Sequence, residues 1–592
     1  MSNFNDDKTE SSFNGNALFR LLTYTKPHLH WFGISLVLVM ILTGTELLRP
    51  IFIGDAINLF KEKGQPSELT ATVIKYGIVL VIGVICDLWQ GWILQKTGQK
   101  IIFGIRKEIY LHIQSLSSRF FDLTPVGKLV TRVTNDVDAL EEMYSGILVK
   151  LFRNIVYIIG LAVIMLTLDY KLALFSFVLL PFVVLLTGLL RYFSRKAFRV
   201  SRARLTDLNT FLSENITGMK IIQIFGREER KYEEFDDKSK RFLKASFNEI
   251  MVYATFRPLI YISSILSLMI VLSIGGREVL SETISVGTLY IFAQYIQSFF
   301  DPIQELAEHF ATLQSSLASA EKIFTILDEE AKIPEKENPV ELKDLKGKIE
   351  FSHVWFAYDD ENYVLRDVSF VIEPGQKIAF VGATGAGKTS ILNLIGRYYD
   401  VQKGNIYIDD VDIRDLKKSD LRRFIGQMQQ DVLIFEGTIK SNIRLYDDYI
   451  TDEEVETAAK HVNASHFIEK LPRKYDEPVS ERGATFSTGE KQLLSFARTL
   501  AHKPGILVLD EATANIDTET EILIQDALEK LMKDRTTIMV AHRLSTIQHA
   551  DCIYVLSKGR IIESGNHFEL LDKKGAYYEL YRLQYEEQPG LA

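Results

Sequence analysis

Six long apolar stretches in the first half of the chain limit what this sequence can fold into. A bilayer span needs about 20 mostly apolar residues, and within lipid a helix satisfies its own backbone hydrogen bonds. The pattern therefore predicts six transmembrane helices, with flanking residues completing the shorter ones. Six buried helices of a large soluble core are a disfavoured alternative. The stretches lie at 31–53, 73–94, 155–168, 172–190, 259–276 and 286–300.

The connections between these stretches alternate between short and long. Those at 54–72, 169–171 and 277–284 are brief and carry few basic residues, whereas 95–150 and 191–250 are long, helical in pattern and rich in Lys and Arg. Basic residues concentrate on the cytoplasmic side of a membrane. We therefore expect both termini in the cytoplasm of a multi-pass protein of the cell membrane, with long helical extensions beneath the bilayer.

The second half of the chain has the composition of a soluble, charged α/β protein. A charged segment with two prolines, at 328–348, separates the halves and predicts a linker. We therefore expect a multidomain chain, with an all-α transmembrane domain at 1–327 and an α/β domain at 349–592.

Charge and cysteine content exclude several other classes of protein. The net charge of −9 gives no reason to expect a nucleic-acid partner. Cys86 and Cys552 are the only cysteines and lie far apart, which argues against a disulfide framework or a cysteine-based metal site. The acidic, polar N-terminus predicts that no signal peptide is cleaved from the chain.

A glycine-rich turn follows a predicted strand and opens a predicted helix in KIAFVGATGAGKTSILNLIG. Gly382–Thr389 fits the phosphate-loop pattern, in which glycines let successive backbone N–H groups face phosphates. We expect Lys388 to reach the β- and γ-phosphates of ATP and the Thr389 hydroxyl to coordinate Mg²⁺. The candidate ATP-binding residues are Gly382, Ala383, Thr384, Gly385, Ala386, Gly387, Lys388, Thr389 and Ser390.

Two later strands end in residues suited to phosphoryl chemistry. GILVLDEAT places Asp510 at a strand end, where it could hold Mg²⁺, and Glu511 next to it, where it could polarise an attacking water. TTIMVAHRLST ends near His542, a donor suited to a γ-phosphate. An acidic strand-end turn is the plainer interpretation of the first segment. A structural histidine is the plainer interpretation of the second, and the presence of Lys388 and Glu511 weakens it.

These ordered motifs resemble those of ATP-binding cassette (ABC) exporters over nearly the whole chain. Tyr358 in FAYDD is similar to the aromatic residue that stacks on adenine in this family. Gln430 matches the glutamine that contacts the metal and the attacking water, although Gln429 stands where proline is common. Asp517 in ANID matches the acid of the loop that crosses between two cassettes.

The resemblance extends into the membrane half. The segments 120–140 and 213–229 are similar to the two coupling-helix regions, which transmit motion between cassette and membrane helices in this family. The implied fold is a six-span all-α domain followed by an α/β phosphate-loop cassette. The implied activity is ATP-driven transport, with ATP and Mg²⁺ as cofactors.

The turn FSTGE at 486–490 occupies the position of the family's signature LSGGQ but departs from it. In this family the signature of one chain, here Ser487, Gly489 and Glu490, contacts ATP bound mainly by the other chain. Thr488 adds a side chain where a γ-phosphate approaches closely, and Glu490 adds negative charge there. Harmless drift, with Glu490 turned to solvent or paired with Lys491, is the alternative.

A complete catalytic set beside an altered signature favours a heterodimer. The chain then resembles the subunit of heterodimeric bacterial multidrug exporters that carries the competent glutamate. Its expected partner is a second half-transporter with a regular signature and a degenerate catalytic glutamate. The alternatives are a lipid flippase, a homodimeric exporter, and an ATP-regulated channel or sensor subunit.

The last apolar stretch suggests the kind of substrate. Gln294, Gln297 and Asp301 lie at helical spacing, which suits either a cavity for small amphipathic compounds or ordinary helix packing. We expect Asp301 to pair with Arg257, while Glu46 and Asp87 are charged intramembrane residues without an evident partner in the sequence.

Overall fold

The computed structural model describes residues 15–62, 64–330, 333–342, 344–359, 362–429, 432–480, 483, 485–510, 518–540 and 547–585. The chain divides into two compact units. The first contains Met1–Gln114 and Val126–Glu329, and the second contains Ser115–Pro125 and Glu330–Ala592. The short segment Ser115–Pro125 therefore belongs with the second unit, although the sequence alone placed it in the membrane half.

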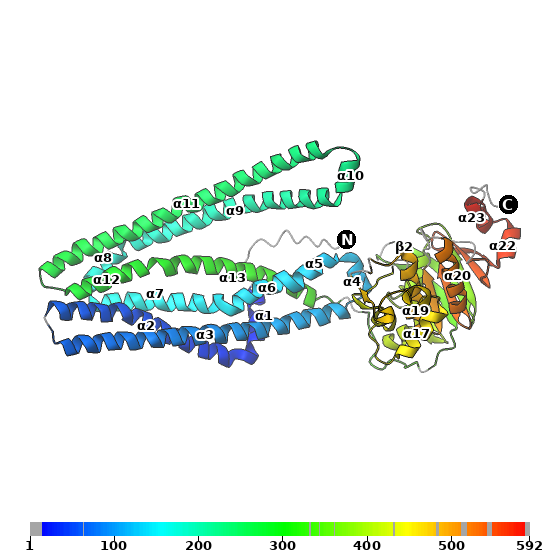
Figure 1. Ribbon diagram of the computed structural model, residues 1–592, viewed down its shortest axis with the longest axis horizontal. Coiled ribbons are helices and arrows are strands. Elements are labelled where there is room, and N and C mark those ends of the chain that lie inside the picture. The colour runs from blue at the N-terminus through cyan, green and yellow to red at the C-terminus, as the bar shows by residue number, and fades with distance from the viewer. Residues whose placement is uncertain are drawn as a thin grey trace. The chain divides into compact units, whose positions relative to one another are not determined.

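The first unit is built from helices (Figure 1). Short π-helical turns at Arg132–Asp136 and Met143–Ile147 interrupt its middle part. The helices are α1 (Gly15–Thr25), α2 (Leu29–Lys61), α3 (Pro66–Ser115), α5 (Val126–Thr131), α6 (Val137–Glu142), α7 (Leu148–Leu168), α8 (Tyr170–Ser176), α9 (Leu180–Thr217), α10 (Met219–Ile224), α11 (Glu228–Leu280), α12 (Val286–Ser298) and α13 (Phe300–Leu327).

Five helical segments of the described chain are long and apolar enough to cross a membrane. Such helices occur in lipid because they satisfy their backbone groups internally. The sixth predicted span, 286–300, coincides with α12, which has 13 residues, and with the start of α13. The count of six spans therefore stays a prediction. The five segments are Ala17–Lys61, Pro66–Ser115, Val126–Leu168, Tyr170–Thr217 and Glu228–Leu280.

Polar contacts inside the first unit join helices that are distant in sequence. Glu46 of α2 accepts an ion-paired hydrogen bond from Arg153 of α7 at 2.6 Å, so Glu46 has the partner that its sequence did not reveal. Asn154 donates to Glu305 of α13 at 3.0 Å. Because an uncompensated charge in lipid costs several kcal/mol, these contacts favour one packing of α2, α7 and α13.

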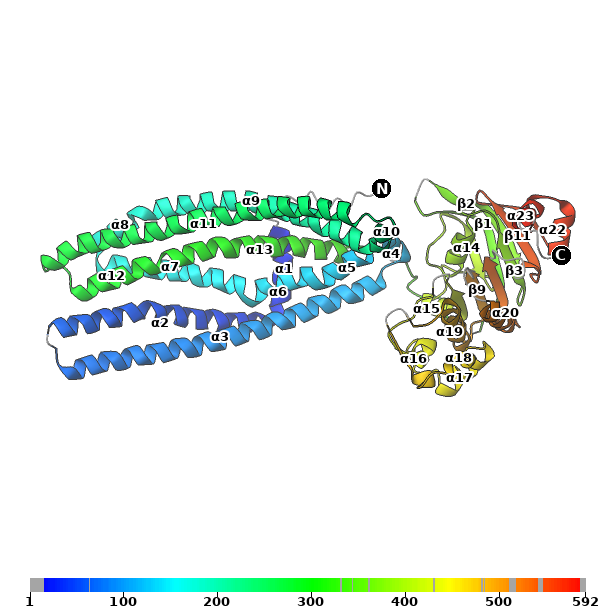
Figure 2. The same ribbon diagram turned by 45° about the horizontal axis from the view of Figure 1, so that its top comes forward.

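Two long helices, α9 and α11, include most of the basic segment 191–250 that the sequence predicted to be helical. Figures 1 and 2 show α9 and α11 running side by side, with α10 connecting their ends. Large apolar side chains where these helices meet are exposed, including Ile216 at the end of α9, Ile221 of α10 and Phe225 after it. The predicted region 213–229 thus contains one short helix, α10, between two long ones.

The second unit contains two larger sheets and a small one. In the six-stranded sheet, with order β12-β11-β3-β10-β9-β6, all neighbours are parallel except β12 and β11, and the four-stranded sheet β2-β1-β4-β5 is antiparallel. The strands are β1 (Ile349–Ala357), β2 (Tyr363–Ile372), β3 (Lys377–Val381), β4 (Lys403–Ile408), β5 (Val411–Asp412), β6 (Ile425–Met428), β7 (Gly437–Thr438), β8 (Pro478–Val479), β9 (Ile506–Asp510), β10 (Thr536–Val540), β11 (Cys552–Ser557) and β12 (Arg560–Gly565).

The parallel strands are buried because helices cover the sheet. All five residues of β10 are buried, and ILVLD of β9 is buried up to Asp510. The helices of this unit are α4 (Ser118–Leu123), α14 (Lys388–Ile395), α15 (Lys418–Phe424), α16 (Ile439–Arg444), α17 (Asp452–His461), α18 (Ser465–Ile468), α19 (Thr488–Ala501), α20 (Thr518–Met532), α22 (His567–Lys573) and α23 (Ala576–Tyr585).

A buried arginine attaches the linker to the second unit. Arg397 is 2% exposed and forms an ion pair with Asp400 at 3.0 Å. Its guanidinium also donates to the carbonyls of Pro334 at 2.9 Å and Ile413 at 3.1 Å. Because one planar guanidinium donates to several acceptors, it joins the linker at Pro334 to the segment that follows β5 at Ile413.

Replacing this arginine should destabilise the second unit. Arg397→Met leaves Asp400 and the carbonyls without their donor, and we expect a loss of about 3 kcal/mol in the free energy of unfolding. The linker segment 333–342 should also become more sensitive to protease. Thermal unfolding and limited proteolysis of the full-length chain would measure both effects. Arg560→Met, at an exposed position of β12, is the matched control, and an equal effect there would contradict the assignment.

Candidate functional site

The predicted phosphate loop lies between the end of β3 and the start of α14. This is the carboxyl edge of the parallel sheet, where open α/β folds bind their ligands. Ala383, Thr384 and Gly385 at the tip of the loop are exposed, whereas Lys388 and Ser390 at its base are buried. The loop therefore presents its backbone to solvent and anchors itself through the first turn of α14.

Two glycines of this loop adopt conformations that other residues disfavour. Gly387 has φ +105°, and a Cβ there would lie 2.6 Å from a Leu365 methyl carbon. Gly385 has φ +81°, and a Cβ there would meet nothing within 4 Å. At position 387, both the positive φ and the close Leu365 side chain favour glycine. At position 385 only the positive φ favours glycine, and this residue lies at the open face where phosphates are expected.

Lys388 is directed into the loop it follows. Its Nζ donates to the carbonyls of Gly382 at 2.6 Å and Ala383 at 3.1 Å. Burial lowers the pKa of Lys388, and the negative charge of Asp510 partly offsets this effect. A buried ammonium whose partners are neutral carbonyls is suited to an anionic ligand, because the ligand supplies the charge that the carbonyls lack.

Asp510 lies at the same edge of the sheet as the phosphate loop. It ends β9 and is paired in register with Val540 of β10, the strand next to β3. The residues present fit Mg²⁺ bound together with a nucleotide, because Thr389 offers a hydroxyl from an exposed position and Asp510 a carboxylate. Among the described residues, no cluster of three or more His, Cys, Asp or Glu could hold a metal ion without such help.

Tyr358 connects the predicted adenine site to the phosphate-loop helix. It follows β1, and its hydroxyl lies 3.0 Å from the Ser390 Oγ. Its ring packs edge-on against Phe356, with centroids 4.8 Å apart. Since Ser390 belongs to the first turn of α14, the aromatic ring and the phosphate loop are held in a fixed relation.

A second tyrosine links this site to α4, an interaction that the sequence did not reveal. Tyr399 is buried and packs perpendicular to Tyr358 at 5.0 Å between centroids. Its hydroxyl donates a hydrogen bond to the Asp122 carboxylate on α4. Burial, with the neighbouring carboxylate, raises the pKa of Tyr399, so the hydroxyl stays protonated and able to donate at neutral pH.

The signature-like turn at the start of α19 binds its own carboxylate. The Ser487 side chain accepts from the Glu490 backbone N–H at 3.2 Å, and the Glu490 carboxylate accepts from the Ser487 backbone N–H at 2.8 Å. This is a capping box, so Glu490 is neither turned freely to solvent nor dependent on Lys491. The Ser-x-x-Glu spacing was the sequence signal that could have revealed it. Thr488 is exposed and Gly489 is buried in the same turn.

The remaining predicted site residues lie outside the described part of the chain. They are Gln430, Glu511, Asp517 and His542. The side chain of Arg257 also lies outside it, so the expected Arg257–Asp301 pair stays a prediction. The structure thus brings together the phosphate loop, Asp510 and Tyr358, and places the Ser487–Glu490 turn at the start of a separate helix.

Known families match both halves of the chain. The family described as ABC transporter transmembrane region matches residues 32–303, and the family described as ABC transporter matches residues 365–514. These two regions contain the predicted spans and the phosphate loop with Asp510, respectively.

Several curated relatives extend the match to nearly the full length. A putative ABC transporter ATP-binding protein of Streptococcus pneumoniae is 41% identical over 96% of this chain and 97% of its own length. An uncharacterized ABC transporter ATP-binding protein of Bacillus subtilis is 38% identical, over 98% and 96%. A putative multidrug export ATP-binding/permease protein of Staphylococcus aureus is 38% identical, over 95% and 99%.

Long apolar helices, a phosphate loop at the edge of a parallel sheet, and full-length similarity lead to the same conclusion. The chain belongs to the ABC transporter family, with a transmembrane region fused to an ATP-binding region, and it couples ATP hydrolysis to transport across a membrane.

Proposed function

We propose that this chain is one subunit of a heterodimeric ABC exporter of the cell membrane, with both termini in the cytoplasm. It contributes the competent catalytic residues, and its partner contributes a regular signature to the same ATP. At the second ATP the roles are reversed, and the altered signature of this chain meets a degenerate catalytic site. The cargo is a small amphipathic compound exported from the cytoplasm or the inner leaflet.

The capping box of α19 is the observation that carries this proposal. The N-terminus of a helix normally attracts an anion through its unpaired N–H groups and its dipole. Here the Glu490 carboxylate accepts a hydrogen bond from the Ser487 backbone N–H and adds negative charge to the turn. A γ-phosphate bound by a partner chain would approach that charge. Two copies of this chain would face this repulsion at both sites, whereas a heterodimer confines it to one.

The proposed chemistry divides between this chain's residues. Lys388 and the loop N–H groups hold the phosphates, Thr389 and Asp510 hold Mg²⁺, and Tyr358 stacks on adenine. Glu511 polarises the attacking water, while Gln430 and His542 orient water and γ-phosphate. Mg²⁺ supplies charge neutralisation on the transferring phosphoryl group. The Asp517 loop contacts the partner cassette.

The substrate class is supported by α12 and the start of α13. The side chains of Gln294, Gln297 and Asp301 are exposed in the first unit, whereas Tyr295 and Phe299, which lie between them in the sequence, are buried. The polar residues thus lie away from the unit's own packing, where a substrate or the partner chain can reach them. Relatives named as multidrug exporters agree with an amphipathic cargo.

ATP hydrolysis should require the partner chain. The chain purified alone in lipid is expected to show little ATPase activity, because its own signature completes the site poorly. Co-expression with a half-transporter that has a regular signature should restore activity, and Glu511→Gln in this chain should then abolish turnover. ATPase and drug uptake in inverted vesicles measure this. Strong ATPase and transport by the isolated chain would exclude the heterodimer.

The charge of Glu490 should weaken ATP binding at the second site. Glu490→Gln keeps a capping-box residue but removes the charge, so we expect a several-fold lower Kd for ATP in the dimer, or about 1 kcal/mol. Thr488→Gly should strengthen the effect by permitting closer approach. Glu469→Gln removes the same charge at an exposed position of the unit and is the control. An equal change in the control, or none in either variant, would count against the role of Glu490.

The Tyr399–Asp122 bond should couple α4 to the nucleotide site. Tyr399→Phe keeps the ring against Tyr358 but removes the hydroxyl, so ATP binding should persist while drug stimulation of ATPase falls several-fold. Asp122→Asn should act in the same direction, and a double-mutant cycle should show non-additivity. Tyr398→Phe, which alters the adjacent and less buried tyrosine, should leave stimulation unchanged. Additive effects would argue against a direct link.

A further inference from the structure

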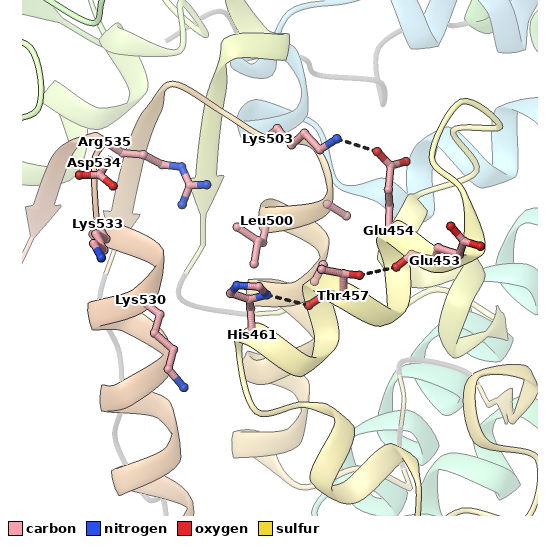
Figure 3. A pocket seen from close by; sticks show the side chains of 12 residues that line it. Glu453, Glu454, Thr457, His461, Leu500, Lys503, Lys530, Lys533, Asp534 and Arg535 are labelled. Carbon is pink, nitrogen blue, oxygen red and sulfur yellow. Dashed lines mark hydrogen bonds and ion pairs between the residues drawn. The ribbon is translucent and has the colours of Figure 1, made fainter.

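A cavity of about 740 Å³ lies in the second unit, apart from the phosphate loop and the signature-like turn. Helix α17 along its length, the end of α19 and the end of α20, with the residues that follow α19 and α20, form its wall (Figure 3). This volume is in the range of sites for small metabolites. The lining residues are Glu453, Glu454, Thr457, Ala458, His461, Leu500, Ala501, Lys503, Lys530, Lys533, Asp534 and Arg535.

The charges are unequally distributed along this cavity. Glu453 and Glu454 lie at the start of α17, and Glu454 is already paired with Lys503 at 2.6 Å. Figure 3 shows Lys503 turned toward Glu454, while Arg535 and Lys530 lie on the opposite side with α20. The end near α20 carries three of the four lysine and arginine side chains of the cavity, Lys530, Lys533 and Arg535, together with the acid Asp534.

Arg535 is the central group of this basic end. It is half-buried, and its Nη1 donates to the Leu531 carbonyl at 2.6 Å. Among the described residues no carboxylate forms an ion pair with it. Burial lowers the pKa of Arg535, and the charge of Asp534 partly offsets this effect. Figure 3 shows the Asp534 carboxylate at the rim, whereas Arg535 extends toward the side of Leu500. A guanidinium in this position lacks an anion.

Neighbouring residues complete a site for an oxyanion. Lys533 is exposed and has no side-chain partner among the described residues, whereas Lys530 is held by Asp526 at 2.5 Å. His461 faces them from α17, with its Nδ1 3.1 Å from the Thr457 carbonyl. Leu500 and Ala501 supply an apolar floor. A guanidinium, an exposed ammonium and a small apolar surface suit a phosphate group attached to an organic molecule.

We propose that this cavity binds a small phosphorylated metabolite, with its phosphate at Arg535 and Lys533. The ligand would connect the end of α19 to the residues that follow α20. The signature-like turn begins the same helix, which has 14 residues, and at about 1.5 Å per residue the two ends lie roughly 20 Å apart. Occupancy of the cavity would thereby bias the position of the turn that faces the partner's ATP.

Equilibrium dialysis with radiolabelled pyrophosphate tests the site in the full-length chain in lipid nanodiscs. Lys388→Ala removes binding at the phosphate loop, and this variant should retain one saturable pyrophosphate site. Adding Arg535→Gln should lower the remaining affinity at least tenfold. Adding Lys533→Gln, at an exposed position that folding does not need, should lower it about threefold. Lys470→Gln, also exposed, is the charge-matched control.

The outcomes separate clearly. Weaker binding in both cavity variants but not in the control supports the site, and Arg535→Lys should then bind more tightly than Arg535→Gln. If the Lys388→Ala chain binds no pyrophosphate, or if Lys533→Gln and the control bind alike, the proposal is wrong. The assay needs no partner chain and no ATP hydrolysis, so it does not depend on the heterodimer.

Discussion

Backbone N–H groups at the start of a helix need an acceptor, and two helices of the second unit meet this need in opposite ways. Before α14 stands Gly387, which offers no side-chain cap, and the Lys388 ammonium donates to the loop carbonyl of Gly382. At α19, Ser487 and Glu490 cap the helix themselves. One helix start is therefore prepared for a phosphate, whereas the other already holds a carboxylate. The proposed division of labour between two chains follows from this contrast.

The same requirement, that polar groups be satisfied, shapes the membrane-spanning unit. In lipid a helix satisfies its own backbone groups, which explains why the apolar segments of the chain are helical. Side chains follow the rule as well, since Glu46 meets Arg153 and Asn154 meets Glu305 across helices. These contacts between distant residues select one arrangement among the many that apolar packing alone would permit.

Within the second unit, aromatic and charged contacts link α4 to the predicted adenine site. The α4 segment comes from the membrane half of the sequence, yet it packs with the ATP-binding residues, and Asp122 reaches Tyr399 and, through its ring, Tyr358. We propose that these contacts transmit a displacement of α4 to the nucleotide site. The proposed metabolite cavity lies at the far end of α19 and would add a second input to the same cassette. In this proposal α4 carries the first input and α19 the second.

The sequence by itself determined the kinds of element and the chemistry of the phosphate loop, because apolar length and glycine–lysine spacing are local properties of the chain. It predicted the membrane half, the linker, the loop at Gly382–Thr389 and the departure at Glu490. It predicted six spans, whereas helix length and composition identify five among the described residues. Only the tertiary structure decided that Glu490 caps Ser487, that Glu46 pairs with Arg153, and that Tyr399 joins Asp122. The last two contacts join residues more than 100 positions apart, and a partner at that separation is selected by packing in three dimensions, which no local pattern records.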